Sequence, residues 1–388
     1  MEETVLEWEV GVTGIRNMLA VVGVSTLLAM GTASGAAGQD VKIGVVTALA
    51  GPYANYGRAL TNAVKLAMDD LSAQNFFGAT KVQVIYEDNR SDKQEAISLI
   101  TRLATRDNAV AIIGPASSGE GMAAGPVAVH LKIPLISQGV ADALLALGPW
   151  VFKSPLSPSA VMRDLARYTI QTIKPASCLF VSVRDNEAYI LQKNVLRGLL
   201  EPAGIKTVGD ESILASESDF TALSTKIVAA RPDCLYVTAP VEVAANVILQ
   251  AKQAGLPDST VLLGDPNHTS AVYTKIGGAA VEGTVAAAWF EPDGINDFAR
   301  AFVRNYTQRY GLAPDAFAAD GYTTMMVLAH AIRKAGPNPT RDGVRQALAE
   351  TRDVPGVLGN GLYSLAADRS PDYNSVVLKL KNGKWIRP

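Results

Sequence analysis

The sequence Val41-Lys-Ile-Gly-Val-Val-Thr47 and the helical pattern that follows it decide the fold class. Val41 to Thr47 is rich in β-branched residues and ends in a loop with Gly51-Pro52, which predicts a buried strand. From Ala59 to Leu71, apolar side chains recur every three or four residues. This spacing predicts an amphipathic helix packed on a sheet. The chain therefore begins with a strand-helix unit.

The same unit recurs along the chain. Further strands are predicted at 82–86, 109–113, 133–137, 178–183, 205–211, 234–238 and 260–263, with helices between them. This alternation predicts parallel sheets covered on both faces, in two doubly wound, Rossmann-like α/β lobes. The last third of the chain predicts mostly helices, at 295–310, 314–335 and 340–350, and a hairpin at 376–386 around Asn382-Gly383.

Composition excludes several classes of protein. The 388 residues include 35 basic and 37 acidic side chains, and the formal net charge is -2. A nucleic-acid groove needs clustered Lys and Arg, so we expect no nucleic-acid partner. The chain has 2 Cys and 3 His, too few for a Cys-rich zinc module or a disulfide scaffold. We expect no metal site and no cofactor.

The N-terminal residues predict a secretory signal. The apolar run Met18–Met30 follows Arg16 and precedes small residues up to Gly38. This run is shorter than the ~20 residues of a membrane-spanning helix, so we predict a cleaved signal peptide at 1–37 and a periplasmic location. Acidic residues precede the run where a signal should be basic. An uncleaved anchor is the alternative.

Open parallel sheets bind ligands beyond the carboxyl ends of their strands. Ser117 and Ser118 follow one predicted strand end and begin a helix, where free N–H groups favour a carboxylate or phosphate. Ser117 with Glu120 also fits a capping box, and spacing alone favours capping over ligand binding. His268 falls on another predicted cleft loop, where a solvated histidine is the favoured interpretation.

Motifs for catalysis are weak. Gly119-Glu-Gly-Met-Ala-Ala124 matches the dinucleotide fingerprint, but inside a helix after the third predicted strand rather than directly after the first. An NAD-dependent oxidoreductase is therefore a remote alternative. The sequence contains no Gly-x-Ser-x-Gly elbow, no His-Glu-x-x-His motif and no phosphate-binding Gly-Lys-Ser/Thr loop. We expect no enzymatic activity.

Cys178 and Cys234 occupy matching places in two predicted strands, and these strands should be neighbours. Export makes a disulfide possible. A bridge between adjacent parallel strands is geometrically awkward, so two buried thiols are the favoured interpretation and the disulfide is the alternative.

Several motifs carry a resemblance to a known family. They are Gly51-Pro-Tyr-Ala-Asn-Tyr-Gly57, Tyr86-Glu-Asp-Asn-Arg-Ser-Asp-Lys-Gln-Glu-Ala96, Ile113-Gly-Pro-Ala-Ser-Ser118, Ile133-Pro-Leu-Ile-Ser137 and Gln250-Ala-Lys-Gln-Ala-Gly255. With these, the chain from about Val41 onward resembles the leucine/isoleucine/valine-binding family of periplasmic solute-binding proteins.

The resemblance implies the type I periplasmic binding protein fold, with three crossovers near 156, 287 and 360. Lobe 1 would comprise 41–156 plus 288–360, and lobe 2 would comprise 157–287 plus 361–388. It also implies a monomer that closes by a hinge over a small carboxylate and delivers it to the membrane permease of an ABC importer. A ligand-sensing regulator of the same fold is the alternative function.

The resemblance also implies roles for individual residues. Tyr56 and Tyr189 would cover the ligand from the two lobes, and Phe317 would form an aromatic wall. Ser118, with Ser117 beside it, would bind the ligand carboxylate. The loop of Gly139 and Ala141 would supply only backbone donors, because Ala141 stands where the family has a threonine.

The second lobe departs from the amino-acid receptors of this family. These receptors place a glutamate after the strand corresponding to 260–263 to hold the ligand ammonium, whereas Pro266 falls at or beside that position here. Asp265 is the nearest acid, and Asp142 is a second candidate that we expect to cap a helix. An ammonium buried without a partner would cost several kcal/mol. The ligand is therefore either a branched-chain or other amino acid, or a non-amino organic or aromatic acid.

Overall fold

The computed structural model describes residues 40–388, and the signal peptide predicted at 1–37 lies outside these residues. A parallel sheet in the order β2-β1-β3-β4-β5 forms the centre of the first lobe. Its strands are β1 (Val41–Thr47), β2 (Val82–Asp88), β3 (Ala111–Ile113), β4 (Leu135–Ser137) and β5 (Val151–Lys153). The direction of winding reverses at β1, as a doubly wound fold requires.

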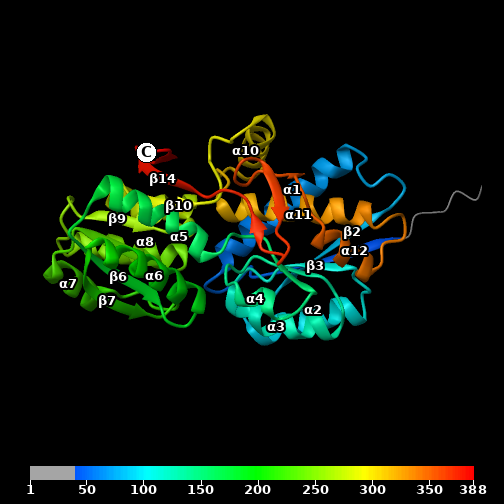
Figure 1. Ribbon diagram of the computed structural model, residues 1–388, viewed down its shortest axis with the longest axis horizontal. Coiled ribbons are helices and arrows are strands. Elements are labelled where there is room, and N and C mark those ends of the chain that lie inside the picture. The colour runs from blue at the N-terminus through cyan, green and yellow to red at the C-terminus, as the bar shows by residue number, and fades with distance from the viewer. Residues whose placement is uncertain (1–39) are drawn as a thin grey trace, which may run out of the picture. The chain divides into compact units, whose positions relative to one another are not determined.

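The second lobe is built on a sheet in the order β15-β14-β10-β9-β8-β6-β7. Strands β6 to β10 are parallel, whereas β14 and β15 are antiparallel to their neighbours. The strands are β6 (Ser177–Val183), β7 (Lys206–Ile213), β8 (Cys234–Thr238), β9 (Val261–Gly264), β10 (Val285–Ala288), β14 (Val376–Lys381) and β15 (Lys384–Ile386). The two sheets lie in the two halves of Figure 1.

Helices cover these sheets (Figure 1). Those in the first part of the chain are α1 (Ala54–Ala73), α2 (Lys93–Thr105), α3 (Ser118–His130) and α4 (Ala143–Ala146). The second lobe contains α5 (Pro158–Tyr168), α6 (Glu187–Leu200), α7 (Thr221–Ala230), α8 (Val241–Gln253) and α9 (Ala271–Gly277), with the short helices η1 (Thr169–Ile173), η2 (Glu201–Ala203), η3 (Pro266–Thr269) and η4 (Gly278–Val281). The last third adds α10 (Asp297–Tyr310), α11 (Ala316–Lys334) and α12 (Arg341–Ala349).

Helix α11 packs closely on α1, although the two are far apart in sequence. Leu60 on α1 and nearly all of α11 are buried. A Cβ at Gly321 would come within 2.8 Å of the Leu60 carbonyl oxygen, so the glycine allows the two helix backbones to approach. The C-terminal third thereby completes the first lobe.

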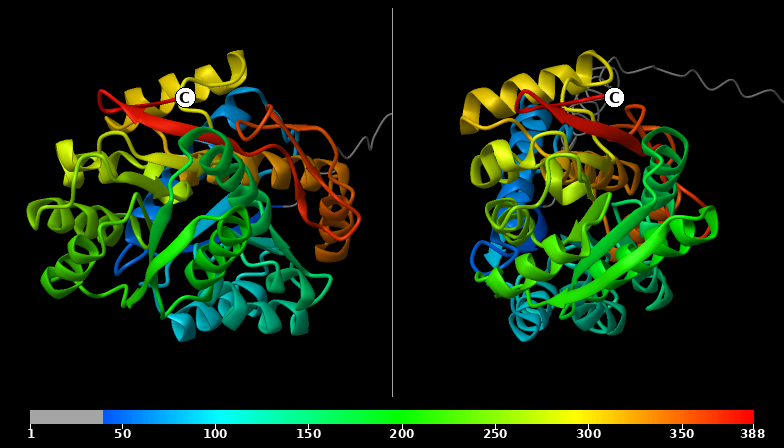
Figure 2. Two further views of the ribbon diagram at one scale, coloured as in Figure 1. Left: turned by 60° about the vertical axis from the view of Figure 1, so that its left-hand side comes forward. Right: turned by 90° about the vertical axis from the view of Figure 1, so that its left-hand side faces the viewer.

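The C-terminal segment then returns to the second lobe. It first forms a small antiparallel sheet of β11 (Val354–Pro355), β12 (Leu362–Leu365) and β13 (Pro371–Asp372). It then runs as β14, drawn in red in Figure 2, and pairs with β10. The predicted hairpin around Asn382-Gly383 is confirmed as β14–β15, and both turn residues have positive φ.

Several elements were not predicted from the sequence. Strand β5 has 3 residues, and β10 has the sequence Val-Ala-Ala-Ala, in which only Val285 belongs to the β-branched and aromatic residues that mark a strand. Strands β11 and β13 have 2 residues each. These elements owe their extended conformation to their neighbours in the sheet.

The favoured prediction of two free thiols is wrong. Cys178 and Cys234 are joined by a disulfide, and both are fully buried. They are register partners on β6 and β8, with their Cα atoms 4.5 Å apart, which lies within the range that a disulfide spans. Direct register opposition brings the two sulfurs together.

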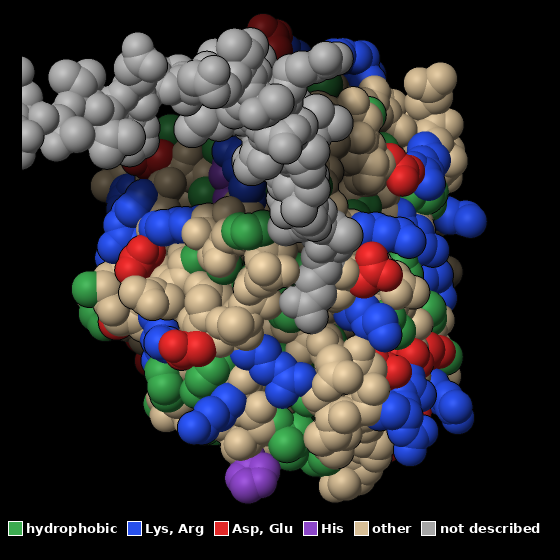
Figure 3. Space-filling view, turned by 90° about the vertical axis from the view of Figure 1, so that its right-hand side faces the viewer, with side chains coloured by type: hydrophobic (Ala, Val, Ile, Leu, Met, Phe, Trp, Pro, Cys, Tyr) green, Lys and Arg blue, Asp and Glu red, His purple; other side chains and the backbone are tan. Residues whose placement is uncertain are grey.

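Charged side chains of both signs are interspersed on the face shown in Figure 3. Exposed ion pairs among the described residues include Lys334 with Glu350. Such pairs contribute about 0–1 kcal/mol each, so the buried cores of the two lobes dominate stability. Within residues 40–388, no helix is long and apolar enough to cross a membrane.

Candidate ligand-binding site

Side chains from both lobes enclose a cavity of about 30 Å³, beyond the carboxyl ends of the parallel strands. This volume has room for about two water molecules. Its lining consists of Tyr53, Tyr56, Ala116, Ser117, Ser118, Gln138, Gly139, Val140, Asn186, Ala188, Tyr189, Gln192, Asn267, Trp289 and Phe317. Not one of these residues carries a formal charge at neutral pH. The cavity is aromatic and polar but uncharged.

Aromatic rings form much of the wall. Tyr56 on α1 stacks on Phe317 of α11, with ring centroids 4.2 Å apart and an interplanar angle of 11°. Trp289, which follows β10, meets Phe317 edge to face and donates a hydrogen bond of 3.1 Å from Nε1 to the Ala316 carbonyl. The close packing of α1 on α11 thus holds a flat apolar surface in the first lobe.

Hydrogen bonds join the two lobes around the cavity. The hydroxyl oxygens of Tyr56 and Tyr189 lie 3.1 Å apart, and the backbone N–H of Val241 donates to the Tyr56 hydroxyl over 3.1 Å. Asn186 donates from Nδ2 to the Tyr53 hydroxyl over 3.0 Å. Burial raises the pKa of Tyr56 and Tyr189 well above the usual tyrosine value, so both stay neutral hydroxyls near pH 7.

Ser117 and Ser118 begin α3 at the edge of the cavity. The predicted capping box is confirmed: the Glu120 N–H donates to Ser117 Oγ, and the Ser117 N–H and hydroxyl donate to the Glu120 carboxylate. Burial raises the pKa of Glu120, and hydrogen bonds from Ser117 and Asn89 oppose this shift. The Ser117 side chain is therefore engaged in the helix cap, whereas the Ser118 side chain makes no capping hydrogen bond and lines the cavity.

The loop between β4 and α4 covers the start of α3. A Cβ at Gly139 would lie 2.7 Å from Ser118 Cα, so only glycine fits this close approach. The Ala141 N–H donates to Ser118 Oγ over 3.2 Å. The Ala141 N–H group, which we expected to face a ligand, is therefore engaged by Ser118.

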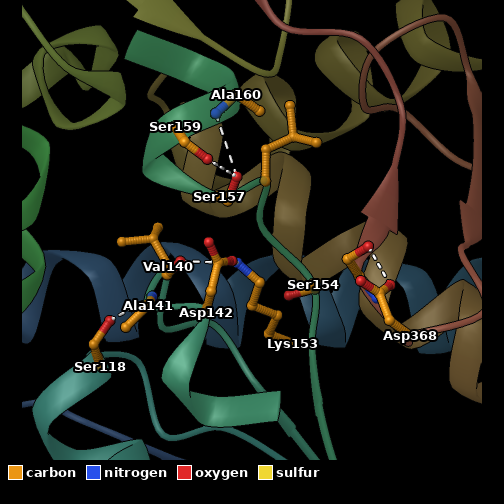
Figure 4. A network of polar contacts seen from close by, with 12 residues as sticks. Ser118, Val140, Ala141, Asp142, Lys153, Ser154, Ser157, Ser159, Ala160 and Asp368 are labelled. Carbon is orange, nitrogen blue, oxygen red and sulfur yellow. Dashed lines mark hydrogen bonds and ion pairs between the residues drawn. The ribbon is translucent and has the colours of Figure 1, made fainter. Parts of the chain in front are cut away.

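Asp142 does not cap a helix as expected. Its side chain makes no capping hydrogen bond and instead forms an ion pair of 2.6 Å with Lys153 of β5 (Figure 4). Lys153 is fully buried, and its Nζ also donates to the Val140 carbonyl over 2.8 Å. Burial lowers the pKa of Lys153, and the Asp142 carboxylate opposes this shift.

Asp265 is fully buried behind the cavity wall. It accepts a hydrogen bond of 2.6 Å from the Thr238 hydroxyl and one of 2.9 Å from the Asn267 N–H, as the N-cap of η3. Its Oδ1 also lies 3.2 Å from His268 Nδ1. The Asp265 carboxylate is therefore engaged by neighbouring protein groups.

The prediction of a solvated His268 is wrong. The ring is fully buried and meets Tyr273 edge to face, with centroids 4.8 Å apart. A Cβ at Gly264 would come within 2.5 Å of the ring, so this glycine provides the space that His268 fills. The short helix η3 directs the His268 ring toward the interior of the second lobe.

The structure places Tyr56, Ser117, Ser118, Gly139, Tyr189 and Phe317 together at the cavity, whereas Ala141, Asp142 and Asp265 are not part of its lining. Six polar or aromatic residues of the lining were not predicted from the sequence: Tyr53, Gln138, Asn186, Gln192, Asn267 and Trp289. Two signals were available: Tyr53 lies within the motif Gly51–Gly57, and Asn186 lies three residues before the predicted site residue Tyr189. Trp289 follows a strand that the sequence did not reveal.

Comparisons with known proteins agree with this architecture. A family model described as periplasmic binding protein matches residues 40–384. Leu/Ile/Val-binding protein homolog 1 of Brucella melitensis is 26% identical and is matched over 95% of this chain and 97% of its own length. The chain therefore belongs to the periplasmic binding protein family, which confirms the resemblance drawn from the motifs.

Solved structures with similar folds bind different ligands. The branched-chain amino acid transporter substrate-binding protein LivJ from Streptococcus pneumoniae, in complex with isoleucine, has a TM-score of 0.83, 24% identity and coverage of 89% of this chain and 98% of that chain. An ABC transporter solute-binding protein from R. palustris, in complex with benzoate, has a TM-score of 0.81, 23% identity and coverage of 90% and 95%. These likenesses confirm the type I fold with two α/β lobes.

Proposed function

We propose that this chain is the exported, periplasmic solute-binding protein of an ABC importer. It binds a small carboxylate without an ammonium group, such as an aromatic or branched aliphatic acid, as a monomer without catalysis. The observation that carries this proposal is the uncharged cavity lining, in which aromatic rings line the same cavity as Ser118 at the start of α3. A helix start favours an anion, and the rings favour an apolar body.

The position of Asp265 supports the absence of an ammonium from the ligand. The carboxylate is fully buried and is held by Thr238, Asn267 and His268. A ligand ammonium enclosed in the cavity would have no carboxylate in contact with it. Its desolvation would then cost several kcal/mol, which is a large part of the binding energy of a micromolar ligand.

Opening and closing of the lobes is part of the proposal. The cavity is too small for an acid of leucine size, so the lobes must separate for a ligand to enter and the wall must adjust around it. Hydrogen bonds at Ser154 connect the crossover segments that would bend during this motion. The Ser154 carbonyl accepts hydrogen bonds from Tyr363 over 3.4 Å and from Tyr373 over 3.2 Å. A closed, loaded form would then be recognised by the membrane permease.

A branched-chain amino acid is the second candidate. The names of relatives such as Leu/Ile/Val-binding protein homolog 1 favour it, and Asp265 lies only two residues from Asn267 of the cavity wall. A rotation of Asp265 out of its η3 cap could provide the missing carboxylate. That rotation would break the capping hydrogen bonds, so we rank this candidate second.

A thermal-shift and calorimetry panel separates the two candidates. Leucine and 4-methylpentanoate form a matched pair that differs in the amino group, and benzoate and 3,4-dihydroxybenzoate test aromatic acids. A ligand at 100 times its Kd stabilises the folded state by about 2.7 kcal/mol. We expect stabilisation by non-amino acids and none by leucine. Stabilisation by leucine without 4-methylpentanoate would establish the second candidate instead.

A further inference from the structure

Lys153 carries a buried ammonium group directly behind the loop that lines the cavity. Its side chain is 0% exposed, whereas the side chain of its partner Asp142 is 54% exposed. Water screens the Asp142 charge more than the buried ammonium charge. The lysine also contacts Val140, which lines the cavity, and Asp142 is not part of the lining. The positive end of this ion pair therefore touches the wall of the site.

One peptide group connects Lys153 to Ser118 (Figure 4). Lys153 Nζ donates to the Val140 carbonyl over 2.8 Å, and the N–H of the same peptide, that of Ala141, donates to Ser118 Oγ over 3.2 Å. The Ser118 hydroxyl accepts this bond, so its own proton is free to be donated to a ligand. Hydrogen bonds in series polarise one another, and each strengthens the next.

We propose that Lys153 is a positioning residue of the anion site. Through the Val140–Ala141 peptide it orients and polarises Ser118, and it thereby makes the cavity prefer a carboxylate to an uncharged ligand of the same shape. This inference rests on the proposed function, because it requires Ser118 to contact the ligand. Within residues 40–388, the cavity lining includes no cation, so this buried lysine adds a positive charge to the field of the α3 N-terminus.

The first experiment compares a carboxylate with its carboxamide. The probes are benzoate and benzamide, with 4-methylpentanoate and 4-methylpentanamide as a second pair. Lys153→Met removes the charge and keeps a long side chain. Lys252→Met is the matched control, because Lys252 Nζ also donates to a backbone carbonyl and a carboxylate, those of Pro257 and Asp258, away from the cavity. Calorimetry gives the ratio of the two affinities for each protein.

We expect Lys153→Met to weaken the carboxylate about tenfold and the carboxamide less than twofold. The control should leave the ratio unchanged, and Lys153→Arg should restore part of it. An equal loss for both probes would mean that Lys153 only holds the loop in place, and no loss would also overturn the proposal.

A second variant keeps the test valid if Lys153→Met does not fold. Asp142→Asn changes a half-exposed side chain and removes the counter-charge of Lys153. At a pH low enough for Lys153 to keep its proton without Asp142, this variant should raise the carboxylate-to-carboxamide ratio by about threefold. A lowered ratio at that pH would contradict the proposal.

A ligand-free measurement separates this inference from the proposed function. In the NMR spectrum of the protein without ligand, the amide proton of Ala141 should move upfield in Lys153→Met, since its hydrogen bond to Ser118 weakens. Lys252→Met should leave it in place. If the wild-type protein binds none of the probes, the proposed ligand class fails, and this resonance still tests the link from Lys153 to Ser118. An unchanged Ala141 resonance would refute that link.

Discussion

The hydroxyl oxygens of Tyr56 and Tyr189 lie 3.1 Å apart across the cavity, although the two residues belong to different lobes and are 133 positions apart in the chain. The Tyr56 hydroxyl also accepts from the Val241 N–H at the start of α8. One hydroxyl from the first lobe therefore satisfies two groups of the second lobe. Under the proposed hinge motion, these bonds would form only in the closed arrangement of the lobes.

Substitution of the two tyrosines should have unequal effects on closure. Tyr189→Phe removes one hydrogen bond, worth about 0.5–1.5 kcal/mol. Tyr56→Phe removes the same bond and also leaves the Val241 N–H without an acceptor, which costs a further 1–3 kcal/mol or so. Small-angle X-ray scattering of the ligand-free variants should show a larger open fraction for Tyr56→Phe. Equal open fractions would mean that the Val241 contact does not contribute to closure.

Alanine variants of Ser117 and Ser118 should distinguish helix capping from ligand binding. Ser118→Ala should weaken a carboxylate ligand by about 1–3 kcal/mol, because it removes the hydroxyl donor and the acceptor of the Ala141 N–H. Ser117→Ala should lower the free energy of unfolding by about 1 kcal/mol through the lost cap, with a smaller effect on affinity. Urea unfolding and calorimetry on both variants test this. The reverse pattern would assign ligand binding to Ser117.

The buried Asp320 should make stability depend on pH. Burial raises the pKa of Asp320 to about 8, and the hydrogen bond of 2.9 Å from Ser154 opposes this shift. In the unfolded chain an aspartate has a pKa of about 3.9. Between pH ~4 and ~8 the folded state therefore holds a proton that the unfolded state has lost, and stability falls as pH rises.

Asp320→Asn should flatten this dependence. At pH ~3 both proteins should have similar free energies of unfolding, because Asp320 is then mostly protonated in both the folded and the unfolded state. At pH ~8 the variant should be more stable by about 2–5 kcal/mol. Urea titrations at several pH values measure the difference, and the contribution of Glu120 cancels because both proteins contain it. Parallel stability curves would show that Asp320 does not titrate in this range.

The disulfide of Cys178 and Cys234 should contribute to stability by limiting the unfolded chain. It joins residues 56 positions apart, and a loop of this size predicts a contribution of about 2–4 kcal/mol. Unfolding and refolding in a phosphine reductant should lower the urea midpoint accordingly. The double variant Cys178→Ala/Cys234→Ala, the control, should be insensitive to the reductant. A wild-type midpoint that the reductant leaves unchanged would show that the bridge does not contribute.

The fold was predictable because its signals are local. The residue pattern within each segment is enough to predict a strand at Val41–Thr47 and a helix from Ala59 to Leu71, without information from the rest of the chain. The capping box of Ser117 and Glu120 was likewise visible within four residues. Strand β10 was not predicted, because its alanines acquire an extended conformation only beside β9 and β14.

The sequence by itself determined the α/β class and, through its family resemblance, the type I fold; it also identified Tyr56, Tyr189, Phe317 and the two serines of the cavity, but not Tyr53 or Trp289. Only the tertiary structure decided the electrostatics of the site. Asp265 and Asp142 are acids in the sequence, but the first is committed to the η3 cap and the second to Lys153. Charge in a binding site depends on burial and on partners from distant strands, and spacing along the chain does not encode these contacts.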